Sequence, residues 1–332
     1  MTSVRRPGKQ GSWYLEDPAA LKQQLHYFLD KVPAKIDDTD LPIPGARIII
    51  GPHAGYSYSG AAAAWAYKAL DLSKAKRVFV LGPSHTFYLH GCAVTGYHNY
   101  GTPFGNLRVD RDVIDSIRKE PDITVIPTRN DDREHSLEMH LPYLWVRLEQ
   151  TFGSSPDAFP PVVPIMVGDG DKDEERRSGA WLAKYLADPE NAFIVSSDFC
   201  HWGDHFSYRP YNADATPGGA LTQVSSRRPP GPGGRPIHET IKMLDDMAID
   251  AIKTGEHGAF FDNLAVTKNT VCGRHPIGVT MAGLEKLRSE ALEEGTGSGE
   301  EGKFKFVRYE RSNLVDDPDD YSVSYVSAYA AL

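Results

Sequence analysis

Histidines follow short apolar runs of the sequence at the point where each run ends. His53 comes after residues 46–50 and is preceded by Gly-Pro, and His85 comes after residues 77–81 and is preceded by Gly-Pro-Ser. His201 follows a third such run. Glycine and proline impose a tight backbone path that aims the next side chain. Because ligands gather at strand ends in an open α/β sheet, we expect these histidines to share one site.

The residue types at this site suit a metal ion. Neutral imidazole binds iron, copper or zinc, and a thiolate from Cys272 would favour copper(I), zinc or iron(II). Asp198 lies three residues before His201 in one polar turn, so the two could orient a ligand or act as an acid/base pair. The simpler alternative is that each histidine caps a turn and that the cysteine is an inert buried residue.

A second polar segment spans residues 131–143 and contains two histidines and several carboxylates. One interpretation is an ordinary charged helix entry, with His135 near the first turn. The other places His135, Glu138 or His140 in the wall of the same cleft. The sequence leaves both open.

Short β-branched runs predict buried strands at residues 46–50, 77–81, 161–167 and 191–196. Amphipathic stretches predict helices at residues 17–32, 59–70, 110–118, 136–149, 178–186, 238–254 and 278–292. Residues 321–331 could add a further strand. The alternation of strands and helices predicts an α/β fold with a sheet at its centre.

Two segments interrupt this pattern. Residues 212–236 are rich in Pro, Gly, Ser and Arg and predict a flexible surface insertion, and residues 293–303 predict an exposed loop. Strand and helix patterns continue on both sides of each segment. We therefore expect one domain over residues 1–332.

Composition excludes several classes of function. The net charge of −9 argues against binding to nucleic acid or to an anionic membrane surface. The three cysteines are far apart and predict no disulfide framework, which fits a reducing compartment. No apolar run approaches the roughly 18 residues that span a bilayer, and the N-terminus lacks the apolar region of a secretion signal. Glycine-rich nucleotide loops, the hydrolase nucleophile elbow and Cys-x-x-Cys are absent from the sequence.

Taken together, six motifs in fixed order resemble the Memo family, which is named after a mediator of receptor-driven cell motility. They are Gly11-Ser-Trp-Tyr14, Pro52-His-Ala-Gly-Tyr-Ser-Tyr58, Leu81-Gly-Pro-Ser-His85, Glu134-His-Ser-Leu-Glu-Met-His-Leu-Pro142, Ser196-Ser-Asp-Phe-Cys-His-Trp-Gly203 and Cys272-Gly-Arg-His-Pro-Ile-Gly278. The motifs extend over nearly the whole chain, and residues 212–236 depart from the family pattern as an insertion.

The resemblance implies a fold like that of class III extradiol non-haem iron dioxygenases: a mixed central β-sheet flanked by helices on both faces. It also implies that His53, His85 and Cys272 are the ligands of one copper or iron ion. His201 would be the acid/base residue, with Asp198 beside it. The related dioxygenases have a carboxylate where this chain has Cys272, which argues against ring-cleaving activity.

Two functions follow from the resemblance. In the first, the protein is a metal-dependent redox protein of metal homeostasis and motility signalling, in the cytoplasm and also the nucleus, with an unnamed small-molecule substrate. In the second, it is a non-catalytic adaptor that binds a phosphotyrosine-type peptide of a signalling partner in the same cleft. Trp13, Tyr56 and Tyr58 would then be aromatic anchors.

Overall fold

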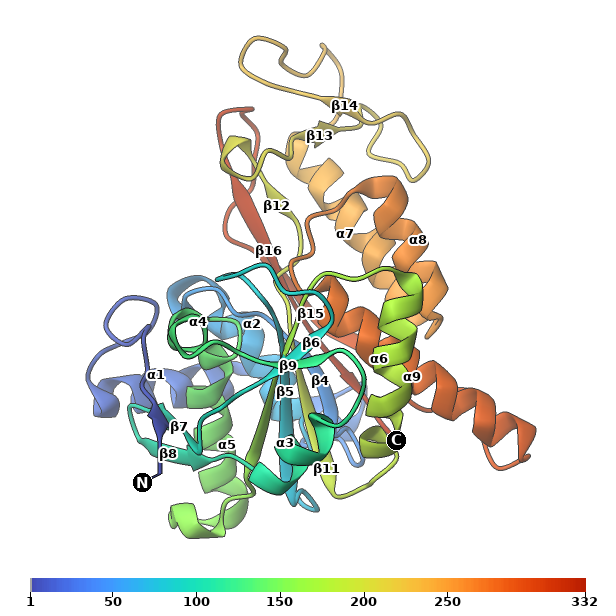
Figure 1. The fold of residues 1–332 in the computed structure, drawn as a ribbon. Coiled ribbons are helices and arrows are strands. Elements are labelled where there is room, and N and C mark those ends of the chain that lie inside the picture. The colour runs from blue at the N-terminus through green and yellow to red at the C-terminus, as the bar shows by residue number, and fades with distance from the viewer. Residues whose placement is uncertain (1) are drawn as a thin grey trace.

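Four buried apolar segments form the parallel centre of one large sheet in the computed structural model, which describes residues 2–332. In spatial order they are β4 (Ile48–Gly51), β11 (Asn191–Ser196), β5 (Arg77–Pro83) and β10 (Val162–Val167). Nearly every residue of these strands is buried, as expected where helices cover both faces of a parallel sheet. The four predicted strands are thus confirmed, and their carboxyl ends lie at one edge (Figure 1).

Antiparallel strands extend the sheet on both sides. β16 (Ser322–Ala330) pairs with β4 and also with β15 (Lys305–Arg311) and β12 (His201–Trp202). At the other end β6 (Cys92–Val94) runs antiparallel to β10 and pairs with β9 (Ile123–Val125). The sheet is therefore mixed, as predicted, and the C-terminal strand is present.

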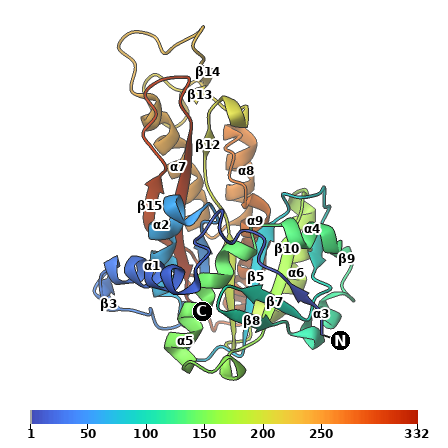
Figure 2. The same ribbon diagram turned by 90° about the vertical axis from the view of Figure 1, so that its left-hand side faces the viewer.

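Helices cover both faces of this sheet (Figure 2). α2 (Tyr56–Ala69) packs on β4, β15 and β16, with α1 (Pro18–Lys31) and α5 (Leu141–Phe152) beside it. α9 (Arg274–Glu293) packs on β5, β10 and β11, and α6 (Lys172–Leu186) packs on α9. The predicted α/β fold class is confirmed.

The remaining elements are short or lie at the periphery. They are β1 (Val4–Arg5), β2 (Lys35–Ile36), β3 (Thr39–Asp40), β7 (Asn99–Thr102), β8 (Gly105–Arg108), α3 (Arg111–Ile117), α4 (Thr128–Arg133), β13 (Pro210–Tyr211), β14 (Thr222–Gln223), α7 (Ile237–Lys253), α8 (His257–Thr267) and the 3-10 turns η1 (Glu138–His140), η2 (Pro156–Ala158) and η3 (Asp204–Phe206).

Several helix boundaries differ from those predicted. The helix expected over residues 136–149 begins as α5 at Leu141, after the 3-10 turn η1. The helix expected from residue 178 begins at Lys172, because Asp171 and Glu174 form a reciprocal capping box at its start. The sequence analysis did not predict α8, because the apolar residues of this segment are not confined to one face and give no clear helical stripe.

A second, smaller apolar cluster lies in the part of the molecule formed by α7, β12 and β13 (Figure 1). Residues 212–236 pass over it, and most of them are exposed. Val224 is nevertheless buried in this cluster, and the Arg235 N–H donates to the carbonyl of Ala213. The single domain, the flexibility of this insertion and the exposed loop 293–303 stay predictions.

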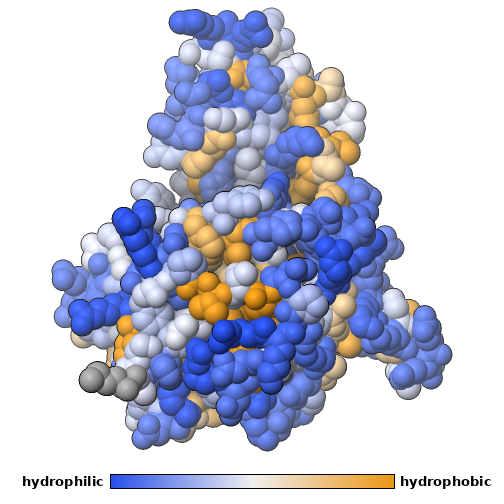
Figure 3. Space-filling view, viewed as in Figure 1, coloured by the Kyte–Doolittle hydropathy of each residue, from blue (hydrophilic) through white to orange (hydrophobic). Residues whose placement is uncertain are grey.

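The face of the molecule drawn in Figure 3 is mostly polar. On the face in Figure 3, hydrophobic side chains gather near the middle of the larger part and along the side that carries α7 and α8. Within residues 2–332, no helix combines the length and apolar character that crossing a bilayer requires.

A buried arginine ties the N-terminal segment to the segment that carries Glu134 and His135. Arg5 is fully buried; its guanidinium contacts Asp131 at 3.3 Å and Glu138 at 2.8 Å, and donates to the Glu134 carbonyl at 2.6 Å. Glu138 also accepts from the backbone N–H groups of residues 8 and 9 and from a tyrosine hydroxyl. The carboxylates of Asp131 and Glu138 are themselves buried, and the guanidinium of Arg5 compensates their negative charges.

We expect Arg5→Ala to lower the free energy of unfolding by about 3–5 kcal/mol, because it leaves two buried carboxylates without their cation. Urea denaturation followed by circular dichroism measures this loss. The neighbouring Arg6 is exposed, so Arg6→Ala is a matched control with an expected change within about 0.5 kcal/mol. Equal midpoints for the two variants would contradict the prediction.

Candidate functional site

A cavity of about 500 Å³ opens at the carboxyl ends of the central strands. The segments after β4, β5 and β11 contribute His53, His85, Asp198 and His201, and the segment after α4 contributes His135. The other lining residues are Ser12, Trp13, Ala54, Gly55, Ser57, Tyr58, Phe206, Ser312, Asn313, Tyr321, Val323 and Tyr325. Four imidazoles therefore converge on one cavity: three from the positions after strands that predicted this, and His135 from the polar segment whose placement the sequence left open.

His53 is held in one tautomer by its hydrogen bonds. Its Nδ1 lies 2.6 Å from the Ser196 hydroxyl, and that hydroxyl donates its only proton to the Ser136 carbonyl at 2.7 Å. The hydroxyl must therefore accept from His53, which places the proton on Nδ1 and leaves a lone pair on Nε2. Burial and the nearby His85 and His135 lower the pKa of His53 well below its usual value. The ring is thus a neutral ligand.

His85 is oriented by a buried carboxylate. Its Nδ1 lies 3.0 Å from Glu134 Oε1, and the same carboxylate accepts from the backbone N–H groups of residues 85, 135 and 136. Burial raises the pKa of Glu134, but the hydrogen bond and charge of His85 and the other donors outweigh burial and lower the pKa to about 2. A carboxylate on Nδ1 leaves Nε2 free, which is the usual arrangement behind a metal-binding histidine.

Cys272 lies against His53, although it is not among the residues that line the cavity. Its Sγ is 3.2 Å from His53 Nε2, and the Asp198 N–H donates to the sulfur at 3.3 Å. The turn that carries it packs closely on β11, since a Cβ at Gly273 would lie 2.3 Å from the carbonyl oxygen of Ser196. Burial, and then the charge of Asp198, raises the pKa of the thiol.

Two groups of side chains could each hold a metal ion, and they share His53. His53, His85 and His135 form one, and His53, Asp198 and Cys272 form the other; within each group the ligand atoms lie within 4.8 Å of one another. The predicted ligands are thus distributed over both groups. Neutral imidazoles, a carboxylate and a sulfur fit copper, iron or zinc.

Asp198 belongs to the second group, and His201 lines the same cavity. The carboxylate of Asp198 accepts from the backbone N–H of His53 at 2.9 Å. Burial raises the pKa of this carboxylate. His201 Nδ1 lies 2.8 Å from the Phe199 carbonyl and 3.1 Å from the Thr270 carbonyl. Two acceptors on Nδ1 require its proton there, so Nε2 is the atom able to take up a proton.

Not every predicted cleft residue lies in the cavity wall. Trp13 and Tyr58 line it, whereas Tyr56 is buried and donates to the Met139 carbonyl at 2.6 Å. His135 lines the cavity and stacks on His85 at 4.4 Å between ring centroids. His140 does not line it, because its buried ring faces the Tyr67 hydroxyl at 2.7 Å.

The sequence analysis missed the residues that fix the imidazoles and those that form the far wall. Glu134 and Ser196 were quoted only as parts of motifs, and no spacing in the sequence pairs them with His85 and His53, which are 49 and 143 residues away. Phe206, Tyr321 and Tyr325 line the cavity from distant segments, and no spacing connects them to the histidines.

Comparisons with known proteins give one consistent result. A family model described as "Memo-like protein" matches residues 5–329. The chain is 36% identical to "Protein MEMO1" of Homo sapiens, with 97% of this chain and 96% of the relative covered. It is 37% identical to "MEMO1 family protein MHO1" of Saccharomyces cerevisiae, with 99% of each covered. The match to "Protein memo-1 homolog" of Caenorhabditis elegans is 36% over 98% of this chain and 81% of the relative.

The pKa of His140 generates a prediction about acid stability. Burial lowers this pKa from 6.5 to about 3, so between these values the unfolded chain binds a proton that the folded chain does not. Above pH 6.5 the neutral His140 does not lower the free energy of unfolding. As the pH falls from 6.5 toward 3, the free energy of unfolding decreases, because only the unfolded chain takes up the proton. At about 1.4 kcal/mol per pH unit, wild type should lose about 2 kcal/mol more than His140→Gln between pH 7 and pH 5. Urea denaturation at both pH values measures this, and equal losses would refute it.

Proposed function

This chain belongs to the Memo family, and from that premise we propose that it is an intracellular redox protein that binds one copper or iron ion. The ligands are His53, His85 and Cys272, and the protein acts in metal and redox homeostasis linked to cell motility signalling. It works in the cytoplasm and also in the nucleus. One observation carries the proposal: Ser196 and Glu134 occupy Nδ1 of two histidines, so Nε2 is the ring atom of each that remains available to a metal ion.

His53 would hold the ion through Nε2, since this ring belongs to both groups of candidate ligands. The Sγ of Cys272 lies 3.2 Å from His53 Nε2. This thiol must lose its proton to bind a metal ion, so metal affinity decreases as the pH decreases. His85, which forms the first group with His53 and His135, would be the third ligand. When bound, such an ion supplies one-electron chemistry to the cavity.

Two side chains of the cavity supply proton transfer and hold the backbone of a ligand in position. His201 holds its proton on Nδ1 through two backbone carbonyls and takes up or releases a proton at Nε2. Asp198 positions the backbone of His53. Cys272 stands where the related dioxygenases have a carboxylate ligand. This difference favours redox chemistry over ring cleavage.

A second candidate function is that of an adaptor for a phosphotyrosine-type peptide. The observation that favours it is the aromatic wall of the cavity, in which Tyr58 is 63% and Tyr321 is 52% exposed, with Trp13 beside them. Such rings suit peptide anchoring. Mass spectrometry of protein purified without chelators distinguishes the two functions: near-stoichiometric copper or iron supports the metal protein, and metal-free protein that binds the peptide supports the adaptor.

We expect Cys272→Ser to abolish tight copper(I) binding, because a hydroxyl is a poor ligand for a soft ion. Competition with a chromophoric copper(I) chelator measures the affinity. Cys92→Ser is the matched control: this buried cysteine lies on β6, outside both candidate groups, and its replacement should leave the affinity unchanged. If Cys272→Ser binds copper(I) like wild type, the metal proposal fails.

We expect His201→Ala to keep most of the metal affinity and to lower any oxygen- or thiol-dependent turnover by about 10²–10⁴-fold, the usual effect of losing an acid/base group. Metal titration and turnover of the loaded protein are measured on the same preparation. Loss of metal as complete as in Cys272→Ser would instead make His201 a ligand.

A further inference from the structure

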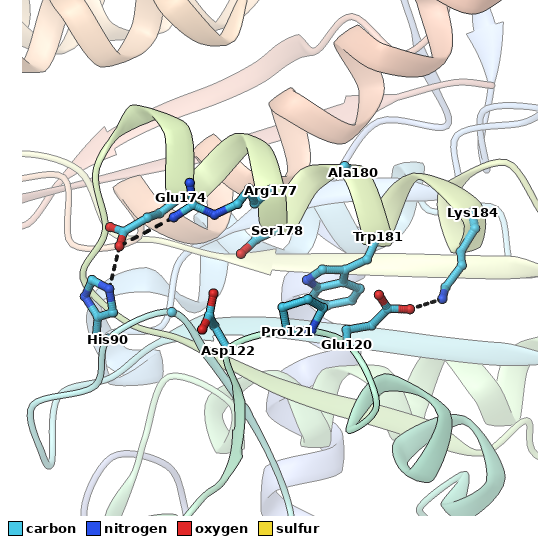
Figure 4. Close-up of a pocket in the computed structure, with 11 residues that line it drawn as sticks. His90, Glu120, Pro121, Asp122, Glu174, Arg177, Ser178, Ala180, Trp181 and Lys184 are labelled. Carbon is cyan, nitrogen blue, oxygen red and sulfur yellow. Dashed lines mark hydrogen bonds and ion pairs between the residues drawn. The ribbon is translucent and has the colours of Figure 1, made fainter.

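A second cavity of about 480 Å³ lies along α6, and it shares no lining residue with the histidine cavity (Figure 4). One wall is the face of α6 that carries Glu174, Arg177, Ser178, Trp181 and Lys184. The other wall is formed by residues 120–122, which precede β9, and by residues 90–91, which precede β6. The function proposed above makes no use of this cavity.

Ion pairs occupy the two ends of this cavity and neutralise the charges there. At one end Glu174 contacts His90 at 2.5 Å and Arg177 at 3.7 Å, and its other oxygen accepts from the Asp171 N–H. At the other end Lys184 pairs with Glu120. Figure 4 shows both pairs, with open space between them.

The middle of the cavity holds polar groups that lack partners among residues 2–332. Asp122 is an exposed residue whose carboxylate points into the cavity and forms no ion pair or hydrogen bond with another described residue (Figure 4). Trp181 is 92% buried by residue area, and its indole N–H, which is accessible to solvent, donates to no group among residues 2–332. The indole and Pro121 form an apolar surface beside these groups.

We propose that this cavity binds the side chain of a lysine in an extended peptide. The ammonium group pairs with Asp122, since the other carboxylates already have cationic partners. The methylene stem lies on the indole of Trp181 and on Pro121, as amphipathic stems do on apolar surfaces. The acidic chain, with its net charge of −9, attracts a basic peptide.

A peptide fits the cavity better than a free amine does. An alkylamine offers no acceptor to the indole N–H of Trp181 or to the hydroxyl of Ser178, whereas a peptide carbonyl does. Burying such donors without acceptors costs affinity. The volume also exceeds the needs of one ammonium group and its stem, which leaves room for the backbone on each side.

The test is a titration of the full chain with acetyl-Gly-Lys-Gly-amide, followed by the ¹⁵N-indole resonance of Trp181 and by calorimetry. The same peptide with norleucine keeps the stem and lacks the ammonium group, and putrescine is a free diamine. Asp122→Asn removes the charge and suits the positive φ of 62° at this position, which asparagine tolerates. Asp173→Asn, on the exposed first turn of α6 and outside the cavity, is the matched control.

We expect the lysine peptide to shift the Trp181 resonance and to bind at least about tenfold more tightly than the norleucine peptide. Asp122→Asn should lose this preference, and Asp173→Asn and Cys272→Ser should keep it. Equal binding of the two peptides, no binding at millimolar concentration, or unchanged binding by Asp122→Asn overturns the proposal. Tighter binding of putrescine than of the lysine peptide overturns the assignment to a peptide.

Discussion

The buried charge of Arg5 is the constraint on which the functional cavity depends. A guanidinium without solvent is tolerated only where carboxylates and carbonyls surround it, and here they come from residues 131, 134 and 138. The N-terminal segment therefore cannot lie elsewhere without leaving two buried carboxylates uncompensated. Its continuation places Trp13 in the cavity wall, where the indole contacts His135 at 4.5 Å between ring centroids.

The same segment fixes the chemistry of the histidines. Glu138 anchors the N-terminal strand, while Glu134, four residues earlier, is buried outside the cavity lining and holds His85. Two carboxylates four residues apart thus perform different tasks, because one meets a guanidinium and the other meets imidazole and backbone N–H groups. The orientation of the imidazoles is a consequence of these partners rather than of the rings themselves.

The two cavities differ in how their charges are arranged. At the histidine cavity, imidazoles, a carboxylate and a thiol form two groups of candidate ligands that share His53, which suits a soft or borderline cation. Along α6, ion pairs close the ends and leave a single carboxylate beside an indole in the middle. The histidine cavity would select a metal ion through the types of its ligand atoms. The cavity along α6 would select a side chain through its charge and shape.

The sequence by itself determined the α/β class, the four central strands and the convergence of His53, His85 and His201, because buried parallel strands leave continuous apolar runs and their ends meet at one edge. It also identified the family through its motifs. It could not decide that Tyr56 and His140 point into the core while Tyr321 and Tyr325 line the cavity, since these directions follow from how α2, α5 and β16 pack. Only the tertiary structure brought Ser196 and Glu134 to Nδ1 of their histidines, from 143 and 49 residues away, and this proximity sets the tautomers. The residue types at the site were local information, but the protonation of each ring depends on contacts that the chain makes only when it is folded.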